Sequence, residues 1–145
     1  MNLLDIQITH EGERNAIVKL TGVLDSSNIS ETPAIALTDF LSKANERIGS
    51  LSGFRVDMIE YSIANDLEVI LEWQGTNPQQ IYALAGQGHI KSRDYGGFIP
   101  DTTRAGYNGN INLRTKNFVP AVDGEGNPQV QNFTVVLELI KLYTQ

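Results

Sequence analysis

The segment FRVDMIEYSIANDLEVILEW, residues 54–73, decides the fold of this chain. Apolar and polar residues alternate along 54–63 and again along 67–73, which is the pattern of half-buried β-strands. Between them lie residues 64–66, Ala-Asn-Asp, and Asn and Asp tolerate the positive φ that a tight turn requires. The segment therefore predicts a β-hairpin.

A three-residue turn fixes the expected pairing of this hairpin. Tyr61 should lie opposite Val69, and Ile59 opposite Leu71, so that one face is wholly apolar. We expect these four side chains to be buried between two sheets together with Leu137 from the last strand.

Other segments show the same alternation. The strands expected from it lie near residues 4–8, 16–23, 89–91, 111–114 and 133–142. The last of them is apolar on both faces, which marks a central strand. The apolar phase also changes between Met58 and Ile59, which predicts a β-bulge there or burial on both faces.

Two segments carry helix signals. Asn77-Pro78 is a good helix start and Gly86 a good stop, so a short helix is predicted near residues 78–85. Residues 33–48 have apolar side chains at helical spacing after a proline, although residues 34–37 also fit a short strand.

Together these patterns predict a mainly β protein, a jelly-roll-like sandwich of two sheets and roughly eight strands, with one short helix. The chain has 145 residues, which fits one domain. We assign residues 16–145 to a single β-sandwich domain and residues 1–15 to an N-terminal arm.

Composition narrows the possible functions. The formal net charge of −6 argues against nucleic acid as a partner. The chain lacks cysteine, and its longest apolar runs fall far short of the ~20 residues that span a bilayer. The first residues also lack the basic and apolar regions of a signal peptide. We expect a soluble protein made in the cytoplasm, with no membrane partner.

The residues give no support for catalysis. Two histidines, His10 and His89, lie far apart in the sequence, so no histidine-rich metal site is expected. Acidic residues of the predicted hairpin, such as Asp57 and Glu72, alternate with apolar ones as on a solvated sheet face. We expect no catalytic residues, no metal and no cofactor.

A locally basic segment is the first candidate interface. Residues 91–116 contain five basic and two acidic residues in an otherwise acidic chain. Tyr and Arg are enriched at protein interfaces. The candidates are Arg93, Tyr95, Arg104 and Tyr107, although solvated loop charges or aromatics covering the end of the core would look the same.

The N-terminal arm is the second candidate. Leu4, Ile6 and Ile8 alternate with polar residues and predict a short strand. This strand either closes its own sandwich as an edge strand or adds to a sheet of a neighbouring subunit. We favour the second placement.

The order of several motifs resembles a family of small structural proteins of tailed bacteriophages, some of which are capsid decoration, or cement, proteins. The motifs are FRVDMIEYSI (54–63), LEW (71–73), ALAGQG (83–88), DYGG (94–97), GNINL (109–113) and FTVVLELIK (133–141). The resemblance covers most of the chain from about Ala16 onward. Residues 1–15 and 43–52 have no counterpart in it.

The resemblance implies a β-sandwich on the capsid exterior that stabilises the shell without enzymatic activity or cofactor. It implies a homo-oligomer, the major capsid protein as partner, a location on the virion surface, and a strand at residues 34–37. The alternatives are a head–tail connector or tail component. A glycan- or cell-surface-binding sandwich is also open, in which Trp73, Tyr82 and Tyr107 stack on sugar rings.

Overall fold

The computed structural model describes residues 1–40, 50–120, 122, 124–127 and 129–144. The described residues form nine β-strands and two short 3-10 helices. The strands are β1 (Leu3–Glu11), β2 (Asn15–Leu24), β3 (Thr32–Ile35), β4 (Ser50–Ile63), β5 (Glu68–Trp73), β6 (Gln79–Leu84), β7 (Gln87–Ile90), β8 (Ile111–Lys116) and β9 (Gln131–Thr144). The 3-10 helices are η1 (Leu37–Asp39) and η2 (Ser92–Tyr95).

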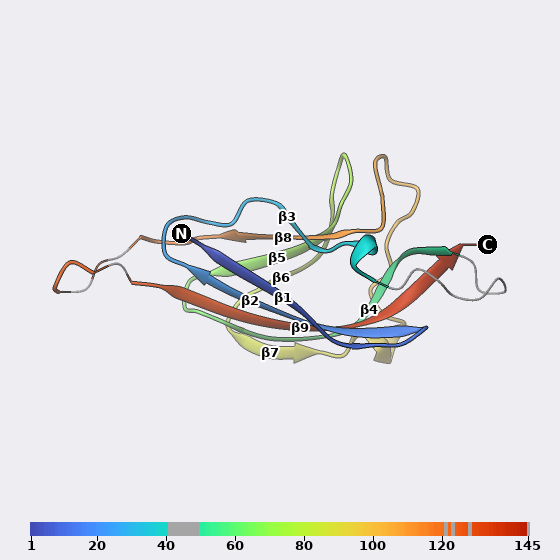
Figure 1. The fold of residues 1–145 in the computed structure, drawn as a ribbon, viewed down its shortest axis with the longest axis horizontal. Coiled ribbons are helices and arrows are strands. Elements are labelled where there is room, and N and C mark those ends of the chain that lie inside the picture. The colour runs from blue at the N-terminus through green and yellow to red at the C-terminus, as the bar shows by residue number, and fades with distance from the viewer. Residues whose placement is uncertain (41–49, 121, 123, 128, 145) are drawn as a thin grey trace.

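The strands form two antiparallel sheets, a five-stranded one in the order β1-β2-β9-β4-β7 and a four-stranded one in the order β3-β8-β5-β6 (Figure 1). Four antiparallel pairs are nested in the sequence, with β5–β6 innermost, then β4–β7, β3–β8 and β2–β9. Successive pairs belong alternately to the two sheets, which is the topology of a jelly roll. The predicted two-sheet, jelly-roll-like β fold is confirmed.

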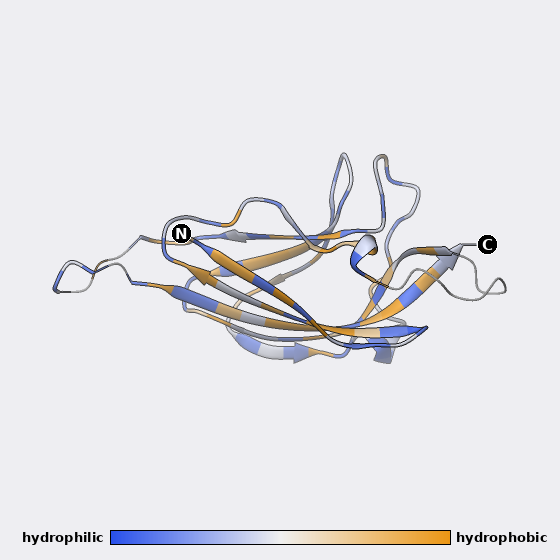
Figure 2. Cartoon of the chain, viewed as in Figure 1, coloured by the Kyte–Doolittle hydropathy of each residue, from blue (hydrophilic) through white to orange (hydrophobic). Residues whose placement is uncertain are grey.

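One hydrophobic cluster joins the two sheets. It contains Val18, Ile59 and Leu137 from the five-stranded sheet together with Val69 and Leu71 from the four-stranded one. Four of the five predicted core residues are therefore buried, and the fifth, Tyr61, is half-buried against the cluster. Figure 2 shows the corresponding hydrophobic stretches on β5 and β9 and the hydrophilic character of β7.

The predicted hairpin pairing is wrong. β4 pairs with β9 and β7, whereas β5 pairs with β6 and β8, so the two strands lie in different sheets. The predicted turn is present, and Asp66 in it has a positive φ of 67°. It carries the chain from one sheet to the other, and Ile59 and Leu71 share the core without being neighbours along a sheet.

A β-bulge interrupts β4 where the apolar phase changes. The register with β9 shifts between Val56 and Met58, one residue from the predicted position. Phe54 and Val56 are buried before the shift and Ile59 after it, because the extra residue returns the apolar side chains to the core. The bulge prediction is confirmed.

The predicted helix near residues 78–85 is also wrong. Gln79–Leu84 forms β6, which pairs with β5 and buries Ile81 and Leu84. Gly86 does adopt the left-handed conformation, with a φ of 72°, but it leads into β7. The residues that suggested helix caps, Asn77-Pro78 and Gly86, thus lie in the turns before and after the edge strand β6.

The segment after β2 agrees with the resemblance in part. Thr32–Ile35 is strand β3, so a helix does not begin at Pro33, and η1 follows at Leu37–Asp39. The remaining part of the predicted helix, residues 41–48, lies outside the described residues.

Candidate interaction surfaces

β1 is the outermost strand of the larger sheet. It pairs with β2 from Leu3 opposite Val23 to Glu11 opposite Ala16. Leu3–Glu11 of the predicted N-terminal arm therefore lies in the larger sheet, paired with β2 of the same chain. β1 is thus an edge strand of its own sheet, and the predicted addition of its other edge to a neighbouring subunit stays a prediction.

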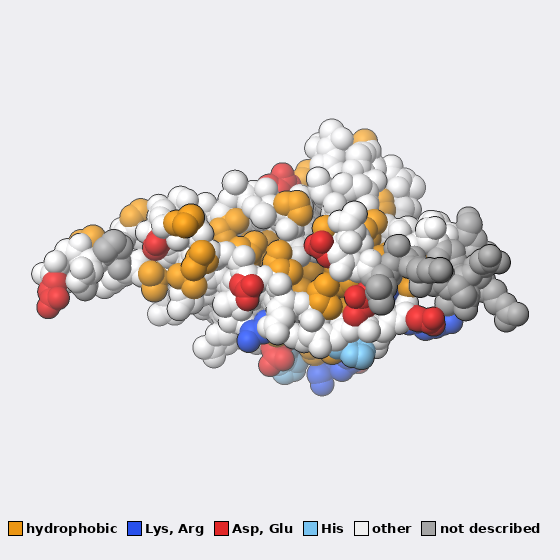
Figure 3. Space-filling model, viewed as in Figure 1, with side chains coloured by type: hydrophobic (Ala, Val, Ile, Leu, Met, Phe, Trp, Pro, Cys, Tyr) orange, Lys and Arg blue, Asp and Glu red, His pale blue; other side chains and the backbone are white. Residues whose placement is uncertain are grey.

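The apolar side chains of β1 face the inside of the sandwich, but the four-stranded sheet does not extend over them. Leu4, Ile6 and Ile8 are paired with Gly22, Leu20 and Val18, and residues paired across antiparallel strands share a face. The five-stranded sheet extends one strand past the four-stranded one, so Ile6 remains 40% exposed. Figure 3 shows hydrophobic side chains along β1 and in the opening toward β3.

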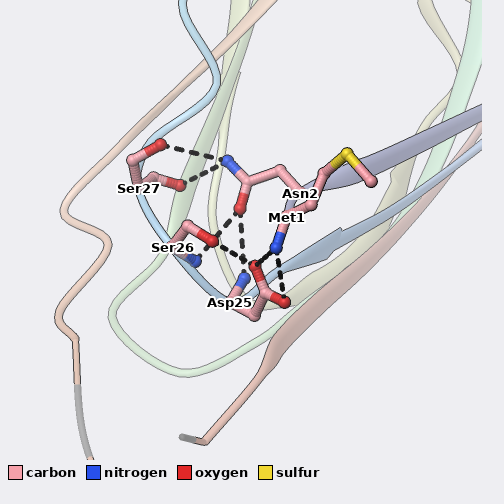
Figure 4. A network of polar contacts seen from close by, with 5 residues as sticks. All are labelled: Met1, Asn2, Asp25, Ser26 and Ser27. Carbon is pink, nitrogen blue, oxygen red and sulfur yellow. Dashed lines mark hydrogen bonds and ion pairs between the residues drawn. The ribbon is translucent and has the colours of Figure 1, made fainter.

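The start of β1 is clamped by the loop after β2 (Figure 4). The Oδ1 atom of Asn2 accepts hydrogen bonds from the backbone N–H groups of Asp25 and Ser26 at 3.1 and 3.2 Å. Its Nδ2 atom donates to the Ser27 carbonyl at 2.8 Å. The α-amino group of Met1 lies 2.8 Å from the Asp25 carboxylate, and hydrogen bonding to that amino group lowers the pKa of Asp25.

The end of β1 is held by an ion pair between a buried lysine and a partly buried glutamate. The Nζ atom of Lys141 on β9 lies 2.7 Å from Oε2 of Glu11, and the lysine side chain is 0% exposed. Beyond it, the Tyr143 hydroxyl donates to the Glu13 carbonyl and Gly12 N–H donates to the Asn15 carbonyl. β1 is thus fixed at both ends, and none of the strands in the described part of the chain pairs with its outer edge.

A second surface lies along β4, where η2 continues the line of β7. The Ser92 hydroxyl donates to the Val56 carbonyl at 2.6 Å, and the backbones of Phe98 and Val56 exchange hydrogen bonds of 2.8 and 2.9 Å. The guanidinium of Arg93 lies 2.9 Å from the Glu138 carboxylate on β9. Tyr95 is left 69% exposed.

The aromatic ring of Tyr82 on β6 lies next to Phe98. Its centroid lies 6.0 Å from that of Phe98, and Tyr82 and Ile99 are both exposed. We refer to Tyr82, Tyr95, Phe98 and Ile99 as the η2 surface. Two of the predicted interface residues, Arg93 and Tyr95, therefore lie on η2, a few residues before Phe98 and Ile99 in the chain.

The other two predicted residues, Arg104 and Tyr107, stabilise a pair of loops instead. Arg104 donates from Nη1 to the carbonyls of Asn77 and Pro78, both at 3.2 Å, and so ties residues 101–109 to the β5–β6 loop. Figure 1 shows these loops rising side by side. Tyr107 is half-buried against the core, and burial raises the pKa of its hydroxyl.

The aromatic set considered for sugar stacking is not assembled. Trp73 is 3% exposed and belongs to the core, while Tyr107 is half-buried. Of the three side chains only Tyr82 presents its ring to solvent.

The acidic residues of the predicted hairpin are separated by the fold. Asp57 lies on β4 and is held by Arg55 at 2.6 Å, whereas Glu72 lies on β5 in the other sheet. Glu72 is buried, not solvated as expected, and lies 3.2 Å from Arg114. Across the described part of the chain, His, Asp and Glu side chains nowhere form a group of three that could hold a metal ion.

Glu72 has a raised pKa, mainly because burial disfavours its charged form and also through a hydrogen bond with Glu31; the Arg114 charge opposes this. Between the pKa of Glu72 in the unfolded chain and its raised pKa in the folded protein, the folded state retains a proton that the unfolded chain releases. The free energy of unfolding therefore falls as the pH rises through this range. We expect Glu72→Gln to remove that loss. The melting temperature of the variant should increase relative to that of the native protein as the pH rises from acid to neutral.

Thermal unfolding of both proteins across a pH series tests this prediction. Glu68→Gln, which alters a less buried glutamate on the same strand, is the control and should show no such trend. A difference between Glu72→Gln and the native protein that shrinks toward neutral pH would contradict the expectation.

Comparison with protein-family models, with curated proteins and with solved structures finds no match. Within the described residues, none of the helices has the length and apolar character needed to cross a membrane. What the protein does must therefore be inferred from its fold and its two exposed surfaces.

Proposed function

We propose that the protein is a non-enzymatic virion component that binds the exterior of a bacteriophage capsid and stabilises the shell. The observation that carries this proposal is the placement of exposed apolar side chains on opposite edges of one jelly roll. Ile6 lies on the β1 edge, and Tyr82 lies on β6 at the far edge of the other sheet. A protein that joins neighbouring subunits needs two such contacts.

The η2 surface is the better candidate for contact with the shell. Tyr95 and Ile99 are 69% and 60% exposed, yet the backbone beneath them is tied to β4 by hydrogen bonds. Exposed aromatic and aliphatic groups on a rigid support bind with little loss of conformational entropy. Such residues are typical of the few that dominate the energy of an interface.

Electrostatic attraction is expected to contribute less than the sequence indicated. Arg93, Arg104 and Arg114 are each within ion-pair distance of an acidic residue of the same chain. Their charges are therefore partly neutralised before any partner arrives. The proposed contact with the major capsid protein should depend mainly on apolar burial and only weakly on salt.

The test is co-sedimentation with shells assembled from the proposed partner, a bacteriophage major capsid protein. The native protein should bind in a fixed ratio and raise the temperature at which the shells come apart. The double variant Tyr95→Ala/Ile99→Ala should lose about 2 kcal/mol of binding, roughly thirtyfold in affinity.

Val119→Ala/Val130→Ala is the matched control, since it removes exposed apolar side chains away from the η2 surface. It should bind shells as the native protein does. Failure of the native protein to sediment with the shells would refute the proposed function, and equal binding by both double variants would refute the assignment of the η2 surface.

A further inference from the structure

The four edges of the two sheets differ in how they are protected. β3 and β7 have four residues each, and β3 contains Pro33, which lacks an N–H donor. β6 has six residues and is interrupted by a register shift against β5. Short strands, prolines and bulges are the usual means of preventing edge strands from pairing with other chains.

β1 has none of these features over most of its length. It has nine residues, and its pairing with β2 is regular from Leu3 to Ile8. Over that stretch it contains no proline or lysine and only one charged residue, Asp5. In an antiparallel strand every second residue directs its N–H and C=O groups away from the neighbour, so β1 presents a row of such groups at its open edge.

We propose that this edge pairs with β1 of a second copy of the chain, in antiparallel orientation about a two-fold axis at Ile6. The two five-stranded sheets then form one continuous ten-stranded sheet. The partner strand covers the apolar row that the shorter opposing sheet leaves open.

The sequence of β1 supports a second copy as the occupant because it is complementary to itself in one register. A continuous sheet requires paired residues to share a face, so the axis must pass through a residue pair. With the axis at Ile6, Leu4 lies opposite Ile8 of the second copy, and Ile6 lies opposite itself. Asp5 then lies opposite Gln7 of the second copy, whose side-chain amide N–H can donate a hydrogen bond to the carboxylate.

The neighbouring registers are less favourable. An axis at Asp5 brings two carboxylates face to face, and like charges directly opposite each other are destabilising. An axis at Gln7 places Leu4 opposite His10, beyond the register shift that follows Ile8. The register at Ile6 is therefore the one that unites all three apolar pairs.

Cysteine cross-linking reads this register directly, because the native chain has no cysteine. Three single variants, Asp5→Cys, Ile6→Cys and Gln7→Cys, are exposed to mild oxidant. Directly opposed residues have Cβ atoms close enough for a disulfide with small adjustment. Ile6→Cys should form covalent dimers fastest, and a mixture of Leu4→Cys with Ile8→Cys should cross-link where either alone does not.

Charge variants provide an independent measurement by analytical ultracentrifugation. Ile6→Lys and Ile6→Glu should each weaken the dimer by at least about tenfold, and mixing the two should restore it as a heterodimer. Gln7→Lys is the control and should keep the dimer, because its charge faces Asp5 of the second copy. Circular dichroism of each variant confirms that the fold is retained.

A native protein that remains monomeric, or fastest cross-linking at residue 5 or 7, would overturn the proposed pairing. In the first case the edge would be left for a strand of a different protein. These measurements use the isolated protein, so their outcome is independent of whether it binds a capsid.

Discussion

Leu137→Ala is expected to lower the free energy of unfolding by roughly 2–5 kcal/mol. Leu137 is 0% exposed and lies on β9, which is paired on one side with β2 and on the other with β4. A strand held on both sides cannot move inward to fill the space left by the missing side chain. The substitution should therefore incur the cost of a cavity in addition to the lost burial.

Urea unfolding followed by circular dichroism measures this effect. Val136→Ala, the adjacent substitution on the half-buried outer face of the same strand, is the control and should cost less. An equal loss for both variants would mean that the core does not lie between the two sheets on the Leu137 side of β9.

Glu11→Ala is expected to cost about 3 kcal/mol, in the range measured when one member of a buried ion pair is removed. The substitution takes away the carboxylate that lies 2.7 Å from the ammonium of Lys141, whose side chain is 0% exposed. The charge of Lys141 would then lose a major compensating group in a site poorly hydrated by water.

The double variant Glu11→Leu/Lys141→Met should recover most of the lost stability, because apolar residues of similar size can replace a buried ion pair. Glu138→Ala, which breaks the more exposed pair with Arg93, should cost less than about 1 kcal/mol. If Glu11→Ala and Glu138→Ala cost the same, the Glu11 pair does not anchor the end of β1.

Residues that face the core were predictable from sequence because burial requires only a local period. Alternation alone located β2, β8 and β9 and identified Ile59, Leu71 and Leu137 as core. The bulge in β4 was visible for the same reason, since an extra residue reverses the apolar phase. None of these inferences needs knowledge of which strand lies alongside.

The pairing of strands could not be predicted from local patterns. The turn at Asp66 looks the same whether it closes a hairpin or carries the chain to the other sheet. Residues 79–84 carry helix caps on both sides, yet β5 offers them a ladder of hydrogen bonds, and this tertiary pairing outweighs a weak local preference.

The contacts that shape the candidate surfaces are equally non-local. Glu11 and Lys141 are 130 residues apart in the chain, and the loops joined by Arg104 are separated by more than twenty residues. The sequence does not show whether Glu11, Lys141 or Arg104 forms an ion pair or hydrogen bond within the fold or carries a charge on its surface. The structure leaves the side chain of Tyr95 exposed, and its place at an interface stays a prediction.

Cryo-electron microscopy of the mature virion tests the proposed function most directly. We expect density for this jelly roll on the outside of the capsid, with the η2 surface against the major capsid protein. Density for the chain at the head–tail junction or within the tail, or a virion without the chain, would contradict it.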